Sequence, residues 1–375
     1  MAAMEKNNKT LNVPNLRFPE FSGEWELVAL KEVADFANGK AHEDSVSEDG
    51  KYILINSKFI STEGKVKKYT DKQLSPLYKN QIVMVMSDLP NGKALAKCYY
   101  INEDDKYTLN QRICSLTPTC CDSRFLLYQI NRNKYYLRFD DGVYQTNLKK
   151  GEVLNCPVYL PSSNEQQKIS ALLSLLDQRI ATQKKVIEKY ESLIRGLYHS
   201  VFNNPSSILQ LREVVSVVKG KQINGEELLE EGKYYVMNGG TEPSGYLDEY
   251  NTPANTISIS EGGNSCGYVQ YNTEPFWSGG HCYSLHQKDE GVNYQYLYHF
   301  LKYKERDIMA LRIGSGLPNV QKKDLERFEI RVLPIEQQNR VAEILEDISA
   351  KCDLEKKILQ EWQWQKSFLL SNLFI

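Results

Sequence analysis

The stretch EQQKISALLSLLDQRIATQKKVIEKYESLIRGLYHSVF, residues 165–202, decides the fold. Its apolar side chains recur in alternating steps of four and three residues, and one polar residue interrupts the pattern. A seam of this kind over about five heptads is typical of a coiled-coil helix, which needs a second helix to cover it. The seam consists of Ile169, Leu173, Leu176, Ile180, Gln183, Ile187, Tyr190, Ile194, Leu197 and Val201.

The same seam returns 172 residues later, at the end of the chain, again with a single polar interruption near its middle. Both helices also begin alike: Leu160-Pro161 precedes Glu165-Gln166-Gln167, and Leu333-Pro334 precedes Glu336-Gln337-Gln338. Two unrelated amphipathic helices would rarely share a beginning and a break. We therefore predict a tandem repeat, each unit being a globular domain followed by one long helix. The second seam consists of Val341, Leu345, Ile348, Cys352, Glu355, Leu359, Trp362, Lys366, Leu369 and Leu373.

Both globular parts contain short β-branched and aromatic runs that end in turn residues, and one helix each, at about 124–138 and 294–304. The predicted fold class is α+β. Two mainly β domains are separated by two long antiparallel helices that form a coiled coil, in a tandem repeat with a pseudo-two-fold axis. The predicted parts are a disordered tail (1–15), a first domain (16–161), a central spacer helix (162–203), a second domain (204–334) and a C-terminal spacer helix (335–375).

The symmetry of the repeat also predicts one contact. In an antiparallel pair related by a two-fold axis, equivalent residues at the middle of the helices meet. Gln183 lies at the middle of the first helix and Glu355 is its equivalent. We therefore expect them to face each other, as a polar pair that fixes the register. The alternative is that both side chains point into solvent.

The composition bounds the class of protein. With 375 residues, 41% of them hydrophobic, the chain has room for two domains beside the helices. A net charge of -2 means that a nucleic-acid role would need positive charge gathered locally. The eight cysteines lack metal-ligand or disulfide spacing, so we expect reduced thiols. The polar start and the lack of a run near the ~20 apolar residues of a membrane span predict a cytoplasmic protein.

Signatures of catalysis are missing from the sequence. It contains no phosphate-binding loop, no G-x-S-x-G elbow and no H-E-x-x-H pair. Gly262–Gly267 is glycine-rich but does not open a helix, so we expect a turn close to a ligand or to backbone. His281, next to Cys282, has a structural and a functional interpretation. We predict no catalytic residues and no metal site.

Positive charge gathers near predicted loops in both repeats. Residues 51–72 hold six lysines against two acidic residues, and residues 302–331 hold eight basic against five acidic residues. Two matching turns, 147–150 and 319–323, end in lysine pairs. A charged run is often only a solvated face, but its presence in both repeats favours a surface that binds phosphates and base edges. The candidate DNA-binding residues are Asn56, Lys58, Lys93, Arg112, Lys149, Lys150, Asn238, Asn264, Lys322 and Lys323.

These motifs resemble the specificity subunit of type I restriction–modification enzymes. The resemblance rests on the two helix beginnings, on the Leu-Lys/Arg-Glu-Val starts at 30–33 and 211–214, and on the glycine-rich turn before each exit. It covers nearly the whole chain after residue 16. It departs at two extra residues before Glu165 and at Lys366, which stands where the second seam requires an apolar residue.

The resemblance implies that each domain is a target-recognition domain that reads one half of an asymmetric bipartite DNA site. It implies that the helices set the spacing and dock two modification (methyltransferase) subunits, and that a restriction subunit joins them. This chain would be non-catalytic and bind no cofactor, with S-adenosylmethionine, ATP and Mg²⁺ on the partner subunits. Helices of about 57 Å would hold the domains at least one turn of DNA, about 34 Å, apart.

One alternative stays open. Two β-rich domains joined by paired helices would also suit a non-catalytic protein scaffold with no DNA role. Binding by a DNA reader weakens steeply as salt concentration rises, because counterions are released from the phosphates. Binding between protein surfaces need not show this dependence.

Overall fold

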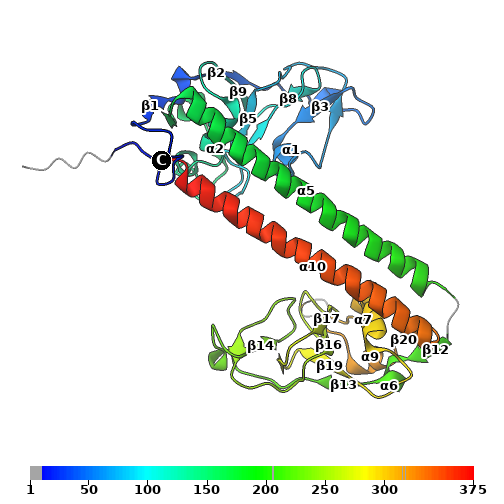
Figure 1. Cartoon of the computed structure of the whole chain (residues 1–375). Helices are drawn as coiled ribbons and strands as arrows, with labels where there is room; N and C mark the ends of the chain where they lie inside the picture. The colour runs from blue at the N-terminus through cyan, green and yellow to red at the C-terminus, as the bar shows by residue number, and fades with distance from the viewer. Residues whose placement is uncertain (1–10, 205–206, 315, 317) are drawn as a thin grey trace, which may run out of the picture. The chain divides into compact units, whose positions relative to one another are not determined.

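The structure contains two long helices, α5 (Ser163–Phe202) and α10 (Ile335–Asn372), and their ends lie close to the predicted bounds of 162–203 and 335–375. The computed structural model describes residues 11–204, 207–314, 316 and 318–375. The chain divides into two compact units: the first ends at Thr182 and also contains Leu359–Ile375, and the second is Gln183–Ile358. Each unit therefore holds one globular domain and part of each long helix, and within each unit the two helices run antiparallel (Figure 1).

The apolar seams face each other in both units. In the first unit, Ile169 and Leu173 pack with Leu373 in one cluster. In the second unit, Gln183 Nε2 donates a hydrogen bond to the main-chain oxygen of Glu355 at 3.0 Å and a second one to its carboxylate. The predicted meeting of these two residues is confirmed, and every predicted seam residue is buried or half-buried.

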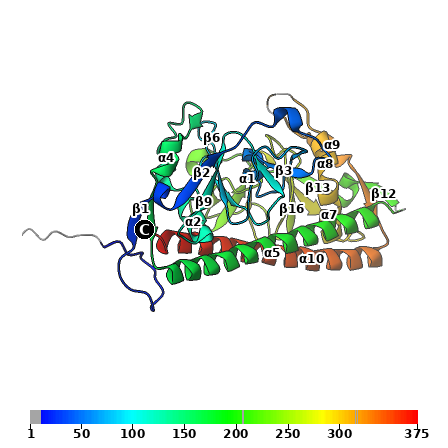
Figure 2. The same ribbon diagram turned by 90° about the horizontal axis from the view of Figure 1, so that it is seen from above.

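Lys366 disturbs the second seam without leaving a charge unpaired. Its Nζ forms an ion pair with Asp177 of α5. The other oxygen of Asp177 accepts a hydrogen bond of 2.6 Å from the Tyr128 hydroxyl. Tyr128 belongs to α2 (Ser123–Ile130), which lies beside the first part of α5 (Figure 2). The lysine thus ties both long helices to the first domain.

Each domain is built on a four-stranded antiparallel sheet. In the first domain the strand order is β2 (Ala34–Asn38), β9 (Ile113–Pro118), β5 (Ile82–Val85), β7 (Cys98–Tyr100). In the second domain it is β13 (Val215–Lys219), β19 (Cys282–Gln287), β16 (Thr256–Ser260), β17 (Val269–Asn272). Because the central strands β5 and β16 are covered on both faces, all their residues are buried.

The smaller sheets recur as well. Three-stranded sheets have the orders β4 (Tyr69–Thr70), β3 (Tyr52–Ile55), β8 (Tyr107–Leu109) and β15 (Tyr246–Leu247), β14 (Tyr234–Met237), β18 (Trp277–Ser278). Two-stranded sheets pair β1 (Glu26–Ala29) with β11 (Pro157–Leu160), and β12 (Ser207–Gln210) with β20 (Glu329–Val332). A further pair, β6 (Ser87–Asp88) with β10 (Thr146–Asn147), corresponds to a bridge between Gly262 and Asn319. The tandem repeat is therefore confirmed strand by strand.

Short helices connect the strands. The first domain contains η1 (Leu30–Glu32), η2 (Glu43–Ser45), α1 (Ser57–Ser61), α2, α3 (Lys134–Leu137) and α4 (Lys150–Leu154). The second contains α6 (Leu211–Val214), η3 (Gly225–Glu227), α7 (Tyr294–Tyr303), α8 (Glu305–Ala310) and α9 (Lys322–Glu326).

Three local predictions need correction. The single helix expected over 124–138 is two helices, α2 and α3. The side chain of Asn133 caps the beginning of α3, so a second helix starts there. The turns predicted at 147–150 and 319–323 continue into α4 and α9. Part of the predicted disordered tail is packed: Pro14 is buried and the Asn12 carbonyl accepts a 2.8 Å hydrogen bond from the Trp25 amide. Residues 1–10 lie outside the described residues.

A buried glutamine fastens each long helix to its domain. Gln166 accepts a 2.9 Å bond from the main-chain N–H of Asp122 and donates a 2.9 Å bond to the Pro161 carbonyl. Gln338 makes the same two bonds, with Asn293 at 2.8 Å and Leu333 at 2.7 Å. The domain thereby holds the first turn of its own helix.

This pairing corrects the predicted alignment of the two Glu-Gln-Gln triplets. Gln166 corresponds to Gln338, so the triplets are offset by one residue and Glu165 corresponds to Gln337. Glu165 has a different partner: both its carboxylate oxygens lie 2.8 Å from the Arg17 guanidinium. The extra residues before Glu165 therefore shift the motif relative to the seam.

A buried histidine predicts a pH dependence for the second unit. His299 of α7 is 2% exposed, and its Nδ1 lies 3.0 Å from the Tyr198 hydroxyl of α5. Burial lowers its pKa to about 4. The unfolded chain, with a pKa of about 6.5, binds more protons, so stability should fall between pH 6.5 and 4 by about 1.4 kcal/mol per pH unit.

Urea unfolding at pH 7 and pH 5 measures this effect. We expect wild type to lose about 2 kcal/mol from His299 between these values, and His299→Phe to lack this loss. His199→Ala, at an exposed position of α5, is the control and should keep it. An unchanged pH profile in His299→Phe would assign the loss to other groups.

Candidate nucleic-acid interface

Several of the predicted DNA-binding residues lie at one edge of each domain, where the central strand ends. In the first domain the Met86 amide donates to the Arg112 carbonyl at 3.0 Å, and the Leu148 amide donates to the Met86 carbonyl at 2.7 Å. These bonds bring Arg112 and Leu148, which precedes Lys149, to the same strand end. We call this edge the reading edge of the first domain.

The second domain repeats this pattern with other side chains. The Glu261 amide donates to the His281 carbonyl at 2.8 Å, and the Val320 amide donates to the Glu261 carbonyl at 2.8 Å. His281 therefore occupies the place of Arg112, and Glu261 the place of Met86. Val320 takes the place of Leu148, two residues before Lys322. This strand end is the reading edge of the second domain.

Two predicted asparagines are also equivalent. The Ile55 carbonyl accepts from Asn110 at 3.0 Å, and the Met237 carbonyl accepts from Gly279 at 2.8 Å. The residues that follow, Asn56 and Asn238, thus have matching places. Asn56 caps α1 through a 2.9 Å bond from the Phe59 amide. Asn238 accepts a 3.1 Å bond from the main-chain N–H of His281.

The predicted basic residues are on the surface, but not all point freely into solvent. Lys150 Nζ lies 5.5 Å from the centre of the Phe36 ring, and Lys322 forms an ion pair of 3.7 Å with Glu326. All six predicted lysines are nevertheless exposed: Lys58, Lys93, Lys149, Lys150, Lys322 and Lys323. A contact of any of them with DNA stays a prediction.

The glycine-rich segment Gly262–Gly267 is a turn, as predicted. Gly263 and Gly267 have φ angles of +78° and +90°. A Cβ on Gly267 would lie 2.8 Å from the backbone of Met309, so close packing against the chain requires glycine here. Asn264 is exposed at the tip of this turn.

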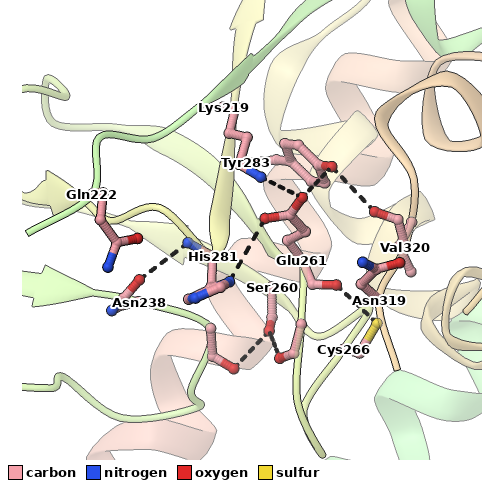
Figure 3. Close-up of polar contacts among 12 residues, drawn as sticks. Lys219, Gln222, Asn238, Ser260, Glu261, Cys266, His281, Tyr283, Asn319 and Val320 are labelled. Atoms are coloured by element: carbon pink, nitrogen blue, oxygen red, sulfur yellow. Dashed lines mark hydrogen bonds and ion pairs between the residues drawn. The ribbon is translucent and has the colours of Figure 1, made fainter. Parts of the chain in front are cut away.

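Glu261 is the centre of a polar network that the sequence did not predict (Figure 3). It is 7% exposed. Its Oε1 accepts hydrogen bonds of 2.7 Å from Lys219 Nζ and 2.9 Å from the Tyr283 hydroxyl. Burial, assisted by this bond to the carboxylate, raises the pKa of Tyr283, so the hydroxyl stays a donor. The Glu261 carboxylate is therefore paired with the Lys219 ammonium group and accepts a hydrogen bond from Tyr283.

The same place in the first domain holds no charged side chain. Strand pairing sets Asn38 opposite Cys114 as it sets Lys219 opposite Tyr283. The Met86 side chain replaces the Glu261 carboxylate beside them. The two reading edges thus share a backbone and differ in chemistry. Sequence reasoning missed Glu261, and it noted His281 without predicting a DNA contact for it, because loop lengths change the residue offset between the repeats.

Neither a metal site nor a membrane span is found in the described residues. No cluster of three or more His, Cys, Asp and Glu side chains is placed there to hold an ion. All eight cysteines are free. Within that part of the chain, each helix is too short or too polar to cross a membrane.

Comparison with known proteins finds similarity to type I specificity proteins along most of the chain. The family model for the type I restriction modification DNA specificity domain matches residues 22–192 and 204–362. A putative type I specificity subunit of Mycoplasma genitalium is 24% identical over 374 residues, covering 93% of this chain and 94% of the relative. A type I restriction enzyme specificity subunit of Methanocaldococcus jannaschii is 22% identical, covering 98% and 95%.

A solved structure has the same fold. The crystal structure of a type I restriction–modification system S subunit from M. genitalium superposes with a TM-score of 0.75 at 23% identity. The superposition covers 97% of this chain and 99% of that one.

Proposed function

Since the chain belongs to the family of type I restriction modification DNA specificity domains, we propose that each of its two domains reads one half of an asymmetric, bipartite DNA site. The chain itself is non-catalytic. It directs a methyltransferase, and in the full complex an endonuclease, to that site.

One observation carries this proposal: the two reading edges have the same backbone and different side chains. Asn56 and Asn238 match, as do the strand ends that hold them. Arg112 is replaced by His281, and Met86 by Glu261. Side chains that differ on a common scaffold select different bases, because each base pair presents its own donors and acceptors in the major groove. Two such edges read an asymmetric site.

The long helices supply surface for partner subunits. Each unit exposes large apolar side chains on α5 and α10 outside the seam, which supports docking of a protein there. We propose two modification subunits, which bind S-adenosylmethionine, and a restriction subunit, with ATP and Mg²⁺ on these partners. The exposed apolar residues are Leu175, Trp364 and Phe368 in the first unit, and Leu193, Ile344 and Leu354 in the second.

Mapping methylated adenines tests the proposed function. The chain is expressed with its modification subunits in cells that lack other adenine methylation, and methylated positions are sequenced. We expect one motif with two unrelated half-sites and an unspecified spacer. Methylation without a bipartite motif would contradict the proposal. DNA binding whose affinity does not change with salt would favour the protein scaffold instead.

The lysines at the reading edges give a quantitative prediction. Replacing Lys149 and Lys150 by alanine should weaken DNA binding and reduce the slope of log K against log salt by roughly one per lost phosphate contact. Lys322 and Lys323 lie on the equivalent turn of the second domain, one residue further along, and should behave alike. The measurement is affinity over a series of salt concentrations.

The matched control is the double variant Lys185→Ala and Lys357→Ala. It removes two exposed lysines from the long helices and changes the net charge equally. We expect its slope to match wild type. If the control and the loop variants lose the same affinity, the effect is one of total charge and the two turns do not contact DNA.

A further inference from the structure

The buried carboxylate of Glu261 has one oxygen without a partner. Oε1 is satisfied by Lys219 and Tyr283, but among the described residues Oε2 accepts no hydrogen bond. Leaving a buried acceptor without a hydrogen bond costs free energy. Such an atom in a native protein therefore calls for a donor, which a side-chain movement or a ligand can supply. The nearest ring nitrogen is Nδ1 of His281, 3.9 Å from Oε2. Figure 3 shows the two side chains directed toward each other.

His281 has a fixed backbone and a free ring. Its amide donates to Asn238 Oδ1, and its carbonyl accepts from the Glu261 amide. Its side chain is 59% exposed. In the described part of the chain, neither ring nitrogen makes a hydrogen bond, and the 3.9 Å between Nδ1 and Glu261 Oε2 is too long for one. The ring therefore stands at the reading edge with one nitrogen near Glu261 and the other available to a ligand.

We propose that His281 reads a base of the second half-site and that Glu261 is its positioning residue. This inference rests on the proposed function of the two reading edges. A small rotation brings Nδ1–H to Oε2, and this bond fixes the tautomer and the ring plane. Nε2 then carries a lone pair that faces away from the carboxylate.

The neighbouring charges decide what Nε2 can bind. Lys219 already neutralises the Glu261 carboxylate, so Glu261 acts on His281 as a hydrogen-bond acceptor rather than as a counter-ion. The outward Nε2 is an acceptor. In the major groove it suits the exocyclic amino group of adenine or cytosine. Arg112, at the same place in the first domain, offers only donors and suits guanine.

The first domain shows that this place tolerates loss of the carboxylate. There Met86 and Asn38 stand where Glu261 and Lys219 stand, and the backbone is the same. A double variant, Lys219→Asn with Glu261→Met, therefore removes the acceptor without leaving an unpaired charge. It complements Glu261→Gln, in which an amide replaces the carboxylate at nearly the same size.

The test uses the full chain together with its modification subunits on plasmids with randomised inserts. Methylated adenines are mapped, and base frequencies are derived at every position of both half-sites. In His281→Ala we expect discrimination at one A·T or C·G base pair of the second half-site to fall at least ten-fold. Glu261→Gln and the Lys219→Asn, Glu261→Met variant should lose discrimination at the same base pair. Combining either with His281→Ala should add nothing.

The first half-site is the internal control, because its reading edge belongs to the other unit. Its base preferences should stay unchanged in all these variants, whereas Arg112→Ala should alter only them. If His281→Ala keeps wild-type base discrimination at every position of the second half-site, the inference is overturned. So would loss of discrimination in the Glu261 variants at base pairs that His281→Ala leaves intact, since Glu261 would then act without His281. A wild-type complex without a bipartite motif would instead refute the proposed function.

Discussion

A fragment of residues 1–203 is expected to form an antiparallel homodimer that directs methylation to a palindromic, interrupted site. It contains one complete repeat: a domain and a helix whose seam has lost its partner. Exposed apolar surface costs about 25 cal/mol per Å². Two copies can cover their seams as the two helices of the full chain do, and the dimer then carries two identical reading edges.

The ends of the helices support this exchange. In the full chain Phe374 packs on Phe125 of the first domain, with ring centres 5.3 Å apart. Phe202, 172 residues earlier, packs on Tyr296 of the second domain, with ring centres 5.4 Å apart. In the fragment, Phe202 of one copy can therefore take the place of Phe374 on Phe125 of the other. The site is symmetric because both halves are read by the first domain.

Sedimentation equilibrium at micromolar concentration measures the dimer, and methylation mapping measures the site. Ile187→Glu, at a buried seam position, should leave the fragment monomeric. Lys185→Glu introduces the same side chain at an exposed position of α5 and should not. A folded wild-type fragment that remains monomeric would refute the repeat argument. A dimer that directs methylation to a non-palindromic site would refute reading by two separate domains.

The long helices and the tandem order could be predicted because they depend on local, periodic information. A heptad pattern fixes the buried face of a helix without knowledge of its surroundings. The recurrence of that pattern then predicts the partner. The contact between Gln183 and Glu355 needed only this symmetry, and it is present. Helix α4 could also have been predicted, because Glu152, three residues after Lys149, is placed to accept a hydrogen bond from the Lys149 amide in the first turn.

The reading edges could not be predicted to the same depth. Leu148 and Val320 are 172 residues apart, whereas Arg112 and His281 are 169 apart and Met86 and Glu261 are 175 apart. Loops of different length lie between these pairs. Their equivalence is visible only in the hydrogen bonds between strands. Glu261 meets Lys219 and Tyr283 across the sheet, 42 and 22 residues away, and no local pattern encodes such contacts.

The glutamines at the start of the long helices are expected to be the most sensitive polar residues outside the reading edges. Gln166→Ala leaves the buried Pro161 carbonyl and the Asp122 amide without partners. Each unsatisfied group costs about 1–3 kcal/mol, so we expect a loss of about 3 kcal/mol in the first unit. For a unit of this size the loss lowers its unfolding temperature by about 6–12 °C.

Gln338→Ala should have the same effect on the second unit, because Gln338 bonds Asn293 and Leu333 in the same way. Calorimetry of the full chain resolves the two units if they unfold separately, and amide hydrogen exchange assigns each transition. The controls are Gln167→Ala and Gln337→Ala, at exposed positions, with changes within about 0.5 kcal/mol. The pair Gln337 and Gln338 decides the alignment of the repeats. If Gln337→Ala costs more than Gln338→Ala, the two triplets match residue for residue, and the one-residue offset between them is wrong.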